Sequence, residues 1–299
     1  MNVITNKSKL YDKLFGLALL GPAVLIVGGF VFLPVFQSVL ISFQDFKLAR
    51  GTSSYPWIGL DNYKLLWEQG DLQHAFWITF SFMLMVVIII LVFSMILSLF
   101  FNQGKSSDRT MRSLILLSWG TPTVIVALLW SWMFQAQYGI INYVLLKLGL
   151  ISESISFLAH PDTALGSVAV AAIWRQLPFM FLMLLSGLQG IPKEMYEAAR
   201  IDGVNSVQSF FYITLPFLRN VIRASVLISI ITSFKQFPLF WVMTGGGPMR
   251  STETLAILTY RNAFVNMNFG IGAAVATSWL AALVLFSIIY NRVFKEASY

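Results

Sequence analysis

Six segments of this chain are each apolar enough and long enough to cross a lipid bilayer. A spanning helix needs about 20 mainly apolar residues. Such segments lie at residues 15–43, 76–101, 114–134, 165–189, 219–243 and 268–291. Only 11% of the 299 residues are charged, against roughly 25% in an average soluble domain. The sequence therefore predicts an all-α membrane protein with six transmembrane helices.

The composition also argues against several kinds of chemistry. Cysteine is absent, so a disulfide framework, a thiol nucleophile and a thiolate metal site are excluded. The two histidines, His74 and His160, fall in expected outer loops, and the spans hold no Ser-His-Asp, paired-carboxylate or metal-ligand spacing. Catalysis and bound metal are not expected. The net charge is +7. In a membrane protein the positions of the basic residues help to set the orientation of the chain, so this charge is not taken as a sign of a nucleic-acid partner.

The positions of the basic residues predict which side of the membrane each loop faces. With the N-terminus inside, the cytoplasmic segments would carry 12 of them: Lys7, Lys9, Lys13, Lys105, Arg109, Arg112, Lys193, Arg200, Arg219, Arg223, Arg292 and Lys295. The outer loops would carry six: Lys47, Arg50, Lys64, Lys147, Arg250 and Arg261. Cytoplasmic loops usually hold the excess of Lys and Arg, so both termini are predicted to be cytoplasmic.

The same pattern divides the chain into four expected parts. Residues 1–14 would be a cytoplasmic N-terminus, and residues 15–75 the first transmembrane helix with a periplasmic loop. Residues 76–291 would form the core transmembrane domain, which includes a long cytoplasmic loop at 190–218. Residues 292–299 would be a cytoplasmic C-terminus.

The loop at 190–218 is polar and has the sequence pattern of a helix, a turn and a second helix. Pro192 is expected in the first turn of a helix of about 11 residues, and Gly203 in a left-handed C-terminal cap. Asn205 and Gln208 resemble a capping box at the start of the second helix. On the first helix, one face is expected to carry Met195, Ala198, Ala199 and Asp202. Periodicity alone leaves two roles open: insertion into a groove of a partner protein, or an amphipathic helix lying on the membrane.

A longer pattern within this loop resembles a known signature. Glu197-Ala198-Ala199 is followed after three residues by Gly203 and, after nine more, by Ile213-Thr214-Leu215-Pro216. This matches at every position the EAA signature of the membrane subunits of bacterial binding-protein-dependent ABC importers. Four further segments resemble the carbohydrate branch of that family: WIGLDNY (57–63), YGIINYVL (138–145), AIWRQLPF (172–179) and TGGGP (244–248). The resemblance extends over nearly the whole chain from Phe15.

The resemblance implies a type I ABC importer permease fold in the bacterial cytoplasmic (inner) membrane. The chain would form half of a translocation pathway for a sugar or related polyol, beside a second homologous permease subunit. Two ATPase subunits would bind ATP and Mg, so no cofactor is expected on this chain. A periplasmic or lipid-anchored solute-binding protein would deliver the substrate.

The resemblance also implies roles for individual residues of the loop, here called the EAA loop. Its first helix would be a coupling helix that sits in a cleft of an ATPase subunit, and six residues would contribute to it: Glu197, Ala198, Ala199, Arg200, Asp202 and Gly203. Leu215 and Pro216 would fix the path of the chain into the fifth span.

Several residues of the spans are candidates for the substrate pathway. A charged group within the bilayer costs a few kcal/mol unless it faces a cavity or a partner, which draws attention to Arg175 and Lys235. Both could instead extend toward the membrane surface. Sugar recognition generally uses aromatic faces and planar polar groups, which adds Trp130, Trp174, Gln176, Gln236 and Trp241. The aromatic residues among them could equally be anchors at the membrane interface.

Other functions are less compatible with the sequence. TGGGP lacks the Lys-Ser/Thr that must follow a phosphate-binding loop, so it is expected to be a periplasmic turn near the docking surface of the binding protein. An ion-coupled secondary transporter would need intramembrane carboxylates, and no Asp or Glu lies in the six spans. An ABC permease for a non-sugar solute remains an alternative.

Overall fold

The computed structural model describes residues 15–16, 19–48, 55–102 and 108–293. The expected cytoplasmic N-terminus at 1–14 lies outside these residues, as do residues 294–299 of the expected C-terminal tail. In the described residues the secondary structure is helical, apart from two isolated backbone bridges, Gln44 to Trp57 and Lys47 to Asn268.

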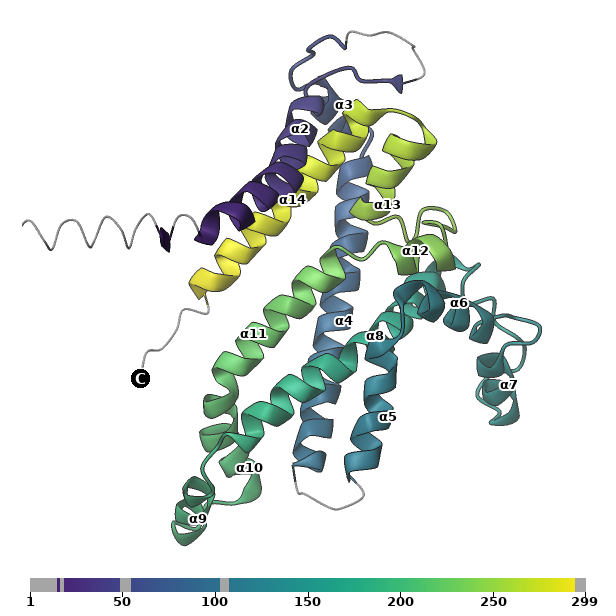
Figure 1. Ribbon diagram of the computed structural model, residues 1–299. Coiled ribbons are helices and arrows are strands. Elements are labelled where there is room, and N and C mark those ends of the chain that lie inside the picture. The colour runs from purple at the N-terminus through teal and green to yellow at the C-terminus, as the bar shows by residue number, and fades with distance from the viewer. Residues whose placement is uncertain (1–14, 17–18, 49–54, 103–107, 294–299) are drawn as a thin grey trace, which may run out of the picture. The chain divides into compact units, whose positions relative to one another are not determined.

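The α-helices and short π-helical stretches (η) follow one another as shown in Figure 1: η1 (Gly28–Phe32), α2 (Leu33–Ile41), α3 (Asp61–Glu68), α4 (Asp71–Phe101), α5 (Asp108–Gly120), α6 (Thr123–Met133), α7 (Ile140–Lys147), α8 (Pro161–Gln189), α9 (Lys193–Ile201), α10 (Ser206–Ser209), η3 (Phe210–Thr214), α11 (Leu215–Phe234), α12 (Pro238–Met243), α13 (Leu255–Tyr260), η4 (Arg261–Val265) and α14 (Phe269–Val293). The chain forms two compact units. The first combines the chain up to Gln69 with Thr259–Ser278, and the second combines Gly70–Leu258 with the chain from Trp279 onward.

The expectation of six spans is confirmed in outline. Five continuous helices are long and apolar enough to cross a membrane, at Leu19–Ile41, Asp71–Phe101, Pro161–Gln189, Ser206–Phe234 and Phe269–Val293. A sixth span is counted if a bent pair of helices, Ser113–Gly120 and Thr123–Met133, is taken as one. The longest of the five, α4, would extend about 46 Å at 1.5 Å per residue, which exceeds a hydrocarbon core about 30 Å thick.

The third predicted span, 114–134, is broken into two helices. The axes of its two halves differ by 104°. The break lies at Thr121 and Pro122, directly after Gly120. Proline has no N–H to donate and disfavours helical geometry in the residue before it. Pro122 adopts an extended ψ of 137° as the N-cap of α6, so the local sequence explains the bend.

The fifth predicted span, 219–243, is misplaced at both ends. Its helix begins earlier, because α10 and η3 run directly into α11, and it ends at Phe234. A separate short helix, α12, then begins at Pro238, which suits proline at a first helical position. Lys235 is the C-cap residue of α11 and is exposed, so it does not lie within the helix as expected.

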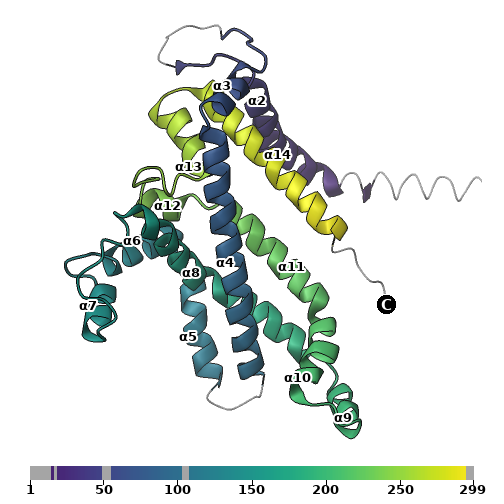
Figure 2. The same cartoon turned by 180° about the vertical axis from the view of Figure 1, so that it is seen from behind.

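The second unit has one main hydrophobic core, built from α4, α6, α8 and α12. Its buried members include Phe82 and Phe240, whose ring centroids lie 4.6 Å apart in an edge-to-face arrangement, and Ile90, Val126 and Leu184. Figures 1 and 2 show α9 and α10 at one end of this unit and α6 and α12 at the other. The two ends of the unit therefore carry different loops, the EAA loop at one end and the segments that adjoin α6 and α12 at the other.

Small and hydroxyl-bearing residues bring the long helices of this unit together. From α4, Ser94 Oγ donates to the carbonyl of Leu177 at 3.2 Å and Ser98 Oγ to that of Phe181 at 3.1 Å. A Cβ added to Gly187 would lie 2.7 Å from a methyl group of Leu218 on α11, so this glycine permits a close approach of α8 and α11. Hydroxyl groups that donate to a neighbouring helix and glycines at helix contacts are both typical of helix packing in membranes.

Two of the motifs noted in the sequence hold loops in place. In WIGLDNY, Asn62 Nδ2 donates to the carbonyls of Ser42 and Gln44 at 2.9 Å each, which ties α3 to the end of α2 in the first unit. In YGIINYVL, Asn142 exchanges two 2.9 Å hydrogen bonds with the backbone of Ile155 in the second unit. Because buried backbone groups need partners, these asparagines are explained by loop structure.

Candidate functional site

The first helix of the EAA loop ends in a complete Schellman cap. The amide of Val204 donates to the carbonyl of Ala199 at 2.9 Å, and the amide of Gly203 to that of Arg200 at 3.1 Å. Gly203 has a φ of +75°, a conformation that glycine adopts without steric cost. The predicted left-handed cap is confirmed. Pro192 is one residue off its predicted place, because it is the N-cap and α9 begins at Lys193.

The two alanines of the signature lie on different sides of α9. Ala199 is 7% exposed, whereas Ala198 is exposed together with Glu194, Glu197 and Ile201. These four exposed positions are spaced three and four residues apart and form one helix face. The expected grouping of Ala198 with Ala199 on one face is therefore wrong.

The inner side of α9 is attached to the ends of α8 and α11. Tyr196 packs against the buried cluster of Leu188, Ile191 and Leu218. Its hydroxyl also lies 2.9 Å from Oγ1 of Thr214. Thr214 occupies the variable position of the signature's I-x-L-P element and is 4% exposed. One hydrogen bond and one apolar contact thus connect the exposed helix to a spanning helix.

The second half of the EAA loop is built as the sequence predicts. Asn205 and Gln208 form the capping box, with bonds of 3.0 and 2.9 Å. The helix that follows contains the π-helical stretch η3, then Leu215 and Pro216 in the first turn of α11. Arg200 and Tyr196 line a pocket of about 450 Å³ between this half of the loop and Leu99 of α4. Asp202 is the exposed C-cap residue of α9.

Two of the transmembrane candidates, Arg175 and Gln176, line a second pocket of about 200 Å³. Its other walls are Trp119, Phe179, Ile228, Ser229 and Thr232. Gln176 is 7% exposed, and neither its Nε2 nor the Nε of Arg175 has a hydrogen-bond partner. Buried polar groups of native proteins are rarely left unpaired, so these two side chains are the strongest functional candidates within the spans.

The sequence contained a signal for part of this pocket that went unused. Ser225, Ser229, Thr232 and Gln236 recur at helical spacing and mark a polar stripe on α11 and its C-terminal extension. Trp119 was missed because nothing along the sequence places α5 beside α8 and α11. It stacks on Phe179 with ring centroids 6.1 Å apart.

The remaining candidates do not line the pocket. Trp130 and Trp174 form an edge-to-face pair with centroids 6.1 Å apart, and Trp241 stacks on Phe237 at 5.9 Å. Gln236 is buried, and its Nε2 has no hydrogen-bond partner. In the part of the chain that the structure describes, no group of three or more His, Asp or Glu is placed to hold a metal ion.

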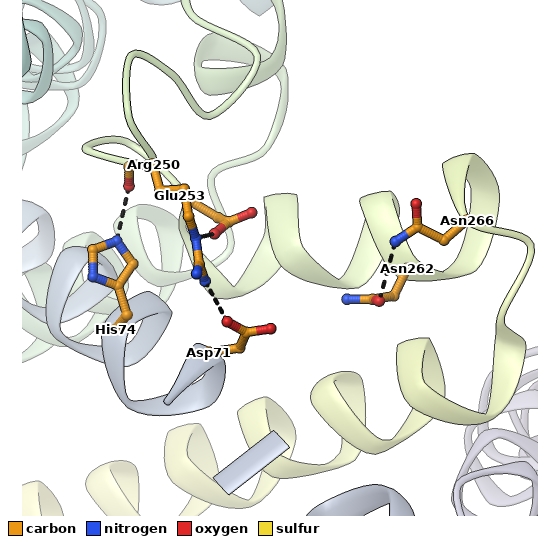
Figure 3. Close-up of polar contacts among 6 residues, drawn as sticks. All are labelled: Asp71, His74, Arg250, Glu253, Asn262 and Asn266. Atoms are coloured by element: carbon orange, nitrogen blue, oxygen red, sulfur yellow. Dashed lines mark hydrogen bonds and ion pairs between the residues drawn. The ribbon is translucent and has the colours of Figure 1, made fainter. Parts of the chain in front are cut away.

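The TGGGP segment leads into an ionic cluster at the end of the second unit where α4 begins (Figure 3). Arg250 pairs with Asp71 of α4 at 2.8 Å and with the buried carboxylate of Glu253. His74 Nε2 lies 2.9 Å from the backbone oxygen of Arg250. Partial burial lowers the pKa of Arg250, but its two acidic partners outweigh this and raise it above its ordinary value. Arg250, two residues beyond the motif, thus fixes this loop to α4, and sequence reasoning did not anticipate its ion pairs.

Spanning helices that surround a pocket with unpaired polar groups, and that carry a rigid polar loop at one end, define a membrane-embedded transport subunit. The family model described as "binding-protein-dependent transport system inner membrane component" matches residues 90–297. The chain belongs to this family of ABC transporter permeases, and it is a transport subunit of the inner membrane.

Individual relatives agree with this assignment. The sulfoquinovosyl glycerol transport system permease SmoG of Agrobacterium fabrum is 33% identical over 95% of this chain and 91% of its own length. The trehalose/maltose transport system permease MalF of Thermococcus litoralis is 30% identical over 98% and 97%. The fold is also similar to that of a chain of a bacterial alginate ABC transporter, solved with an alginate pentasaccharide-bound periplasmic protein. That match has a TM-score of 0.82 and 20% identity over 98% of this chain and 99% of the other.

The hydrogen bond between Tyr196 and Thr214 predicts a local stability effect. Tyr196→Phe and Thr214→Val each remove one hydroxyl and preserve shape, and such a bond contributes about 0.5–1.5 kcal/mol. We expect backbone amides of α9 to exchange hydrogen about 2- to 10-fold faster in either variant, as followed by mass spectrometry of the purified subunit. Thr214→Val also removes a longer hydrogen bond to the carbonyl of Ser209 (3.4 Å), so it should be the quicker single variant. The double variant should exchange no faster, because Tyr196→Phe breaks a bond that Thr214→Val already removes.

Tyr212→Phe is the matched control, because the side chain of Tyr212 is 78% exposed. Its α9 amides should exchange at the wild-type rate. Additive effects of the Tyr196 and Thr214 changes would contradict a shared bond.

Proposed function

We propose that this chain is a permease subunit of an ATP-driven importer for a sugar or a related polyol, and that it forms half of the translocation pathway. The transport systems of the two relatives named above carry a glycosyl glycerol and two disaccharides by their names. Each relative aligns over almost its whole length, which supports a common type of substrate.

The proposed complex contains a second, homologous permease, two ATPase subunits and an extracytoplasmic solute-binding protein. The pocket at Arg175 measures about 200 Å³, below the roughly 300–1,000 Å³ of a complete small-molecule site. A half-site completed by a second permease accounts for that size. The alginate transporter of similar fold is named together with a saccharide-bound periplasmic protein, which supports the same kind of delivery here.

The observation that most supports this proposal is the exposed face of α9. Four residues form this face: Glu194, Glu197, Ala198 and Ile201. Ile201 is 87% exposed, although α9 is firmly attached on its other side. Helices that lie on membranes are usually rich in Lys and Arg, which suits anionic lipid, whereas the exposed charges of α9 are balanced, with Glu194 and Glu197 beside Lys193 and Arg200. These features favour a protein groove over a lipid surface, and we infer that α9 is the coupling helix that enters a cleft of an ATPase subunit.

In this proposal the permease does mechanical work. ATP and Mg bind to the ATPase subunits, and closure of those subunits draws the two coupling helices together and opens the pathway to the outside. The contact between Tyr196 and Thr214 would pass the movement of α9 directly to α11, which lines the pocket with Ser229 and Thr232.

The coupling role predicts the effect of two substitutions in the reconstituted complex. Glu197→Lys reverses a charge that can make a charge-assisted hydrogen bond of about 1.5–3 kcal/mol. Gly203→Val puts a β-branched residue at a positive φ, which distorts the cap. Both variants should insert normally, yet either release the ATPase or hydrolyse ATP without responding to the loaded binding protein.

Glu153→Lys provides a charge-matched control, since Glu153 is exposed on the loop between α7 and α8. It should retain the ATPase and its basal hydrolysis, and only these two readouts are compared, because the loop of Glu153 lies on the outer side where the binding protein would dock. Full stimulation and full uptake in both the Glu197 and Gly203 variants would show that the EAA loop is not the coupling element.

The orientation of the chain is also part of the proposal. With α9 at the cytoplasmic side, both termini are cytoplasmic, as the basic residues indicate. Reporter fusions after Glu68 and Ser154 should read as outside, and those after Gly104 and Ser206 as inside. A cytoplasmic signal from the Ser154 fusion would contradict this topology.

A further inference from the structure

Arg175 brings a full positive charge into a membrane-spanning helix without a countercharge of its own. Arg175 lies in the interior of α8, which runs from Pro161 to Gln189. No ion pair to its guanidinium occurs among the described residues, and its Nε is buried without a hydrogen-bond partner. Such a charge costs several kcal/mol within a bilayer unless a negative group or water compensates it.

The groups around Arg175 have the composition of a saccharide site. Trp119 and Phe179 stack with an interplanar angle of 28° and offer an aromatic wall for a sugar ring. The amide of Gln176, with its unpaired Nε2, and the hydroxyls of Ser229 and Thr232 supply hydrogen-bonding groups on the same pocket. Gln176 is 7% exposed and follows Arg175 directly in the chain, so a cation and an amide occupy neighbouring positions on the pocket wall.

We propose that this pocket is a subsite for an acidic saccharide, in which Arg175 binds a carboxylate or sulfonate group of the substrate and Gln176 binds a neighbouring oxygen. Guanidinium groups bind such oxyanions through two parallel hydrogen bonds. A neutral sugar would leave the charge uncompensated when the pathway closes around it. The inference rests on the proposed importer function and narrows it to sugar acids.

The donor set distinguishes this reading from a neutral-sugar site. Hydroxyl groups can be bound by amides and serines alone, as Gln176, Ser229 and Thr232 would do. An arginine can also donate to a neutral ring, but its charge then has to be compensated by water or by another chain, at a desolvation cost that a neutral donor avoids. The charge of Arg175 is therefore explained best by a charged substrate.

The test uses the complete complex in proteoliposomes and matched pairs of probes. Each pair is a neutral oligosaccharide and its uronic-acid counterpart, supplied with the cognate binding protein. The measured quantity is the ratio of acid uptake to neutral uptake. Arg175→Gln should lower this ratio about 10-fold or more, the loss expected for one charge-assisted contact. Arg175→Lys keeps the charge but loses the two parallel hydrogen bonds, so its ratio should lie between those of the wild type and Arg175→Gln.

Lys235→Gln is the control, because it removes an exposed cation beyond the end of α11 and outside the pocket. It should leave the ratio unchanged. The proposal is overturned if the wild-type complex carries no acidic probe, or if Arg175→Gln leaves the ratio unchanged. It is also overturned if that variant separates the two permeases, which would mean that Arg175 pairs with the partner subunit. Neutral uptake by the wild type would in each case leave the importer function standing.

Discussion

The hydrocarbon interior of a bilayer offers no hydrogen-bond partner, and this constraint governs the whole chain. Each polar group there must form a hydrogen bond with the protein or with water. A group that forms none costs several kcal/mol. Ser94 and Ser98 meet the constraint by donating to carbonyls of α8. Arg175 and Gln176 do not meet it within the described chain. Because Arg175 and Gln176 also line a pocket, they are the groups for which we propose a partner outside the chain.

The EAA loop solves a different problem, which is to hold a nine-residue helix rigidly outside the spans. An isolated helix of that length is marginal in water. The Schellman cap at Gly203, the buried contact of Ala199 and the bond between Tyr196 and Thr214 supply the missing stability.

Sequence patterns predicted much of this structure because their signals are local. Apolar length located the spans, and the positions of Gly203, Asn205 and Gln208 predicted the cap and the capping box. The misjudged features depend on details that hydropathy averages out. Gly120-Thr121-Pro122 bends the third span, and the Lys235–Pro238 region ends the fifth one early. The pocket combines residues of α5, α8 and α11, and no window along the sequence brings those residues together. The separation of Ala198 from Ala199 likewise depends on what covers α9.

The central claim is that α9 presents one face to an ATPase subunit and the other to its own chain. The sequence has no cysteine, so single cysteines at positions 194, 197, 199, 201 and 215 can each carry a photo-activated cross-linker in the assembled complex. Cross-links to the ATPase should form from 194, 197 and 201, and not from the buried position 199 or from 215. Equal cross-linking from 199, or cross-links from 194, 197 and 201 that reach lipid alone, would contradict the account.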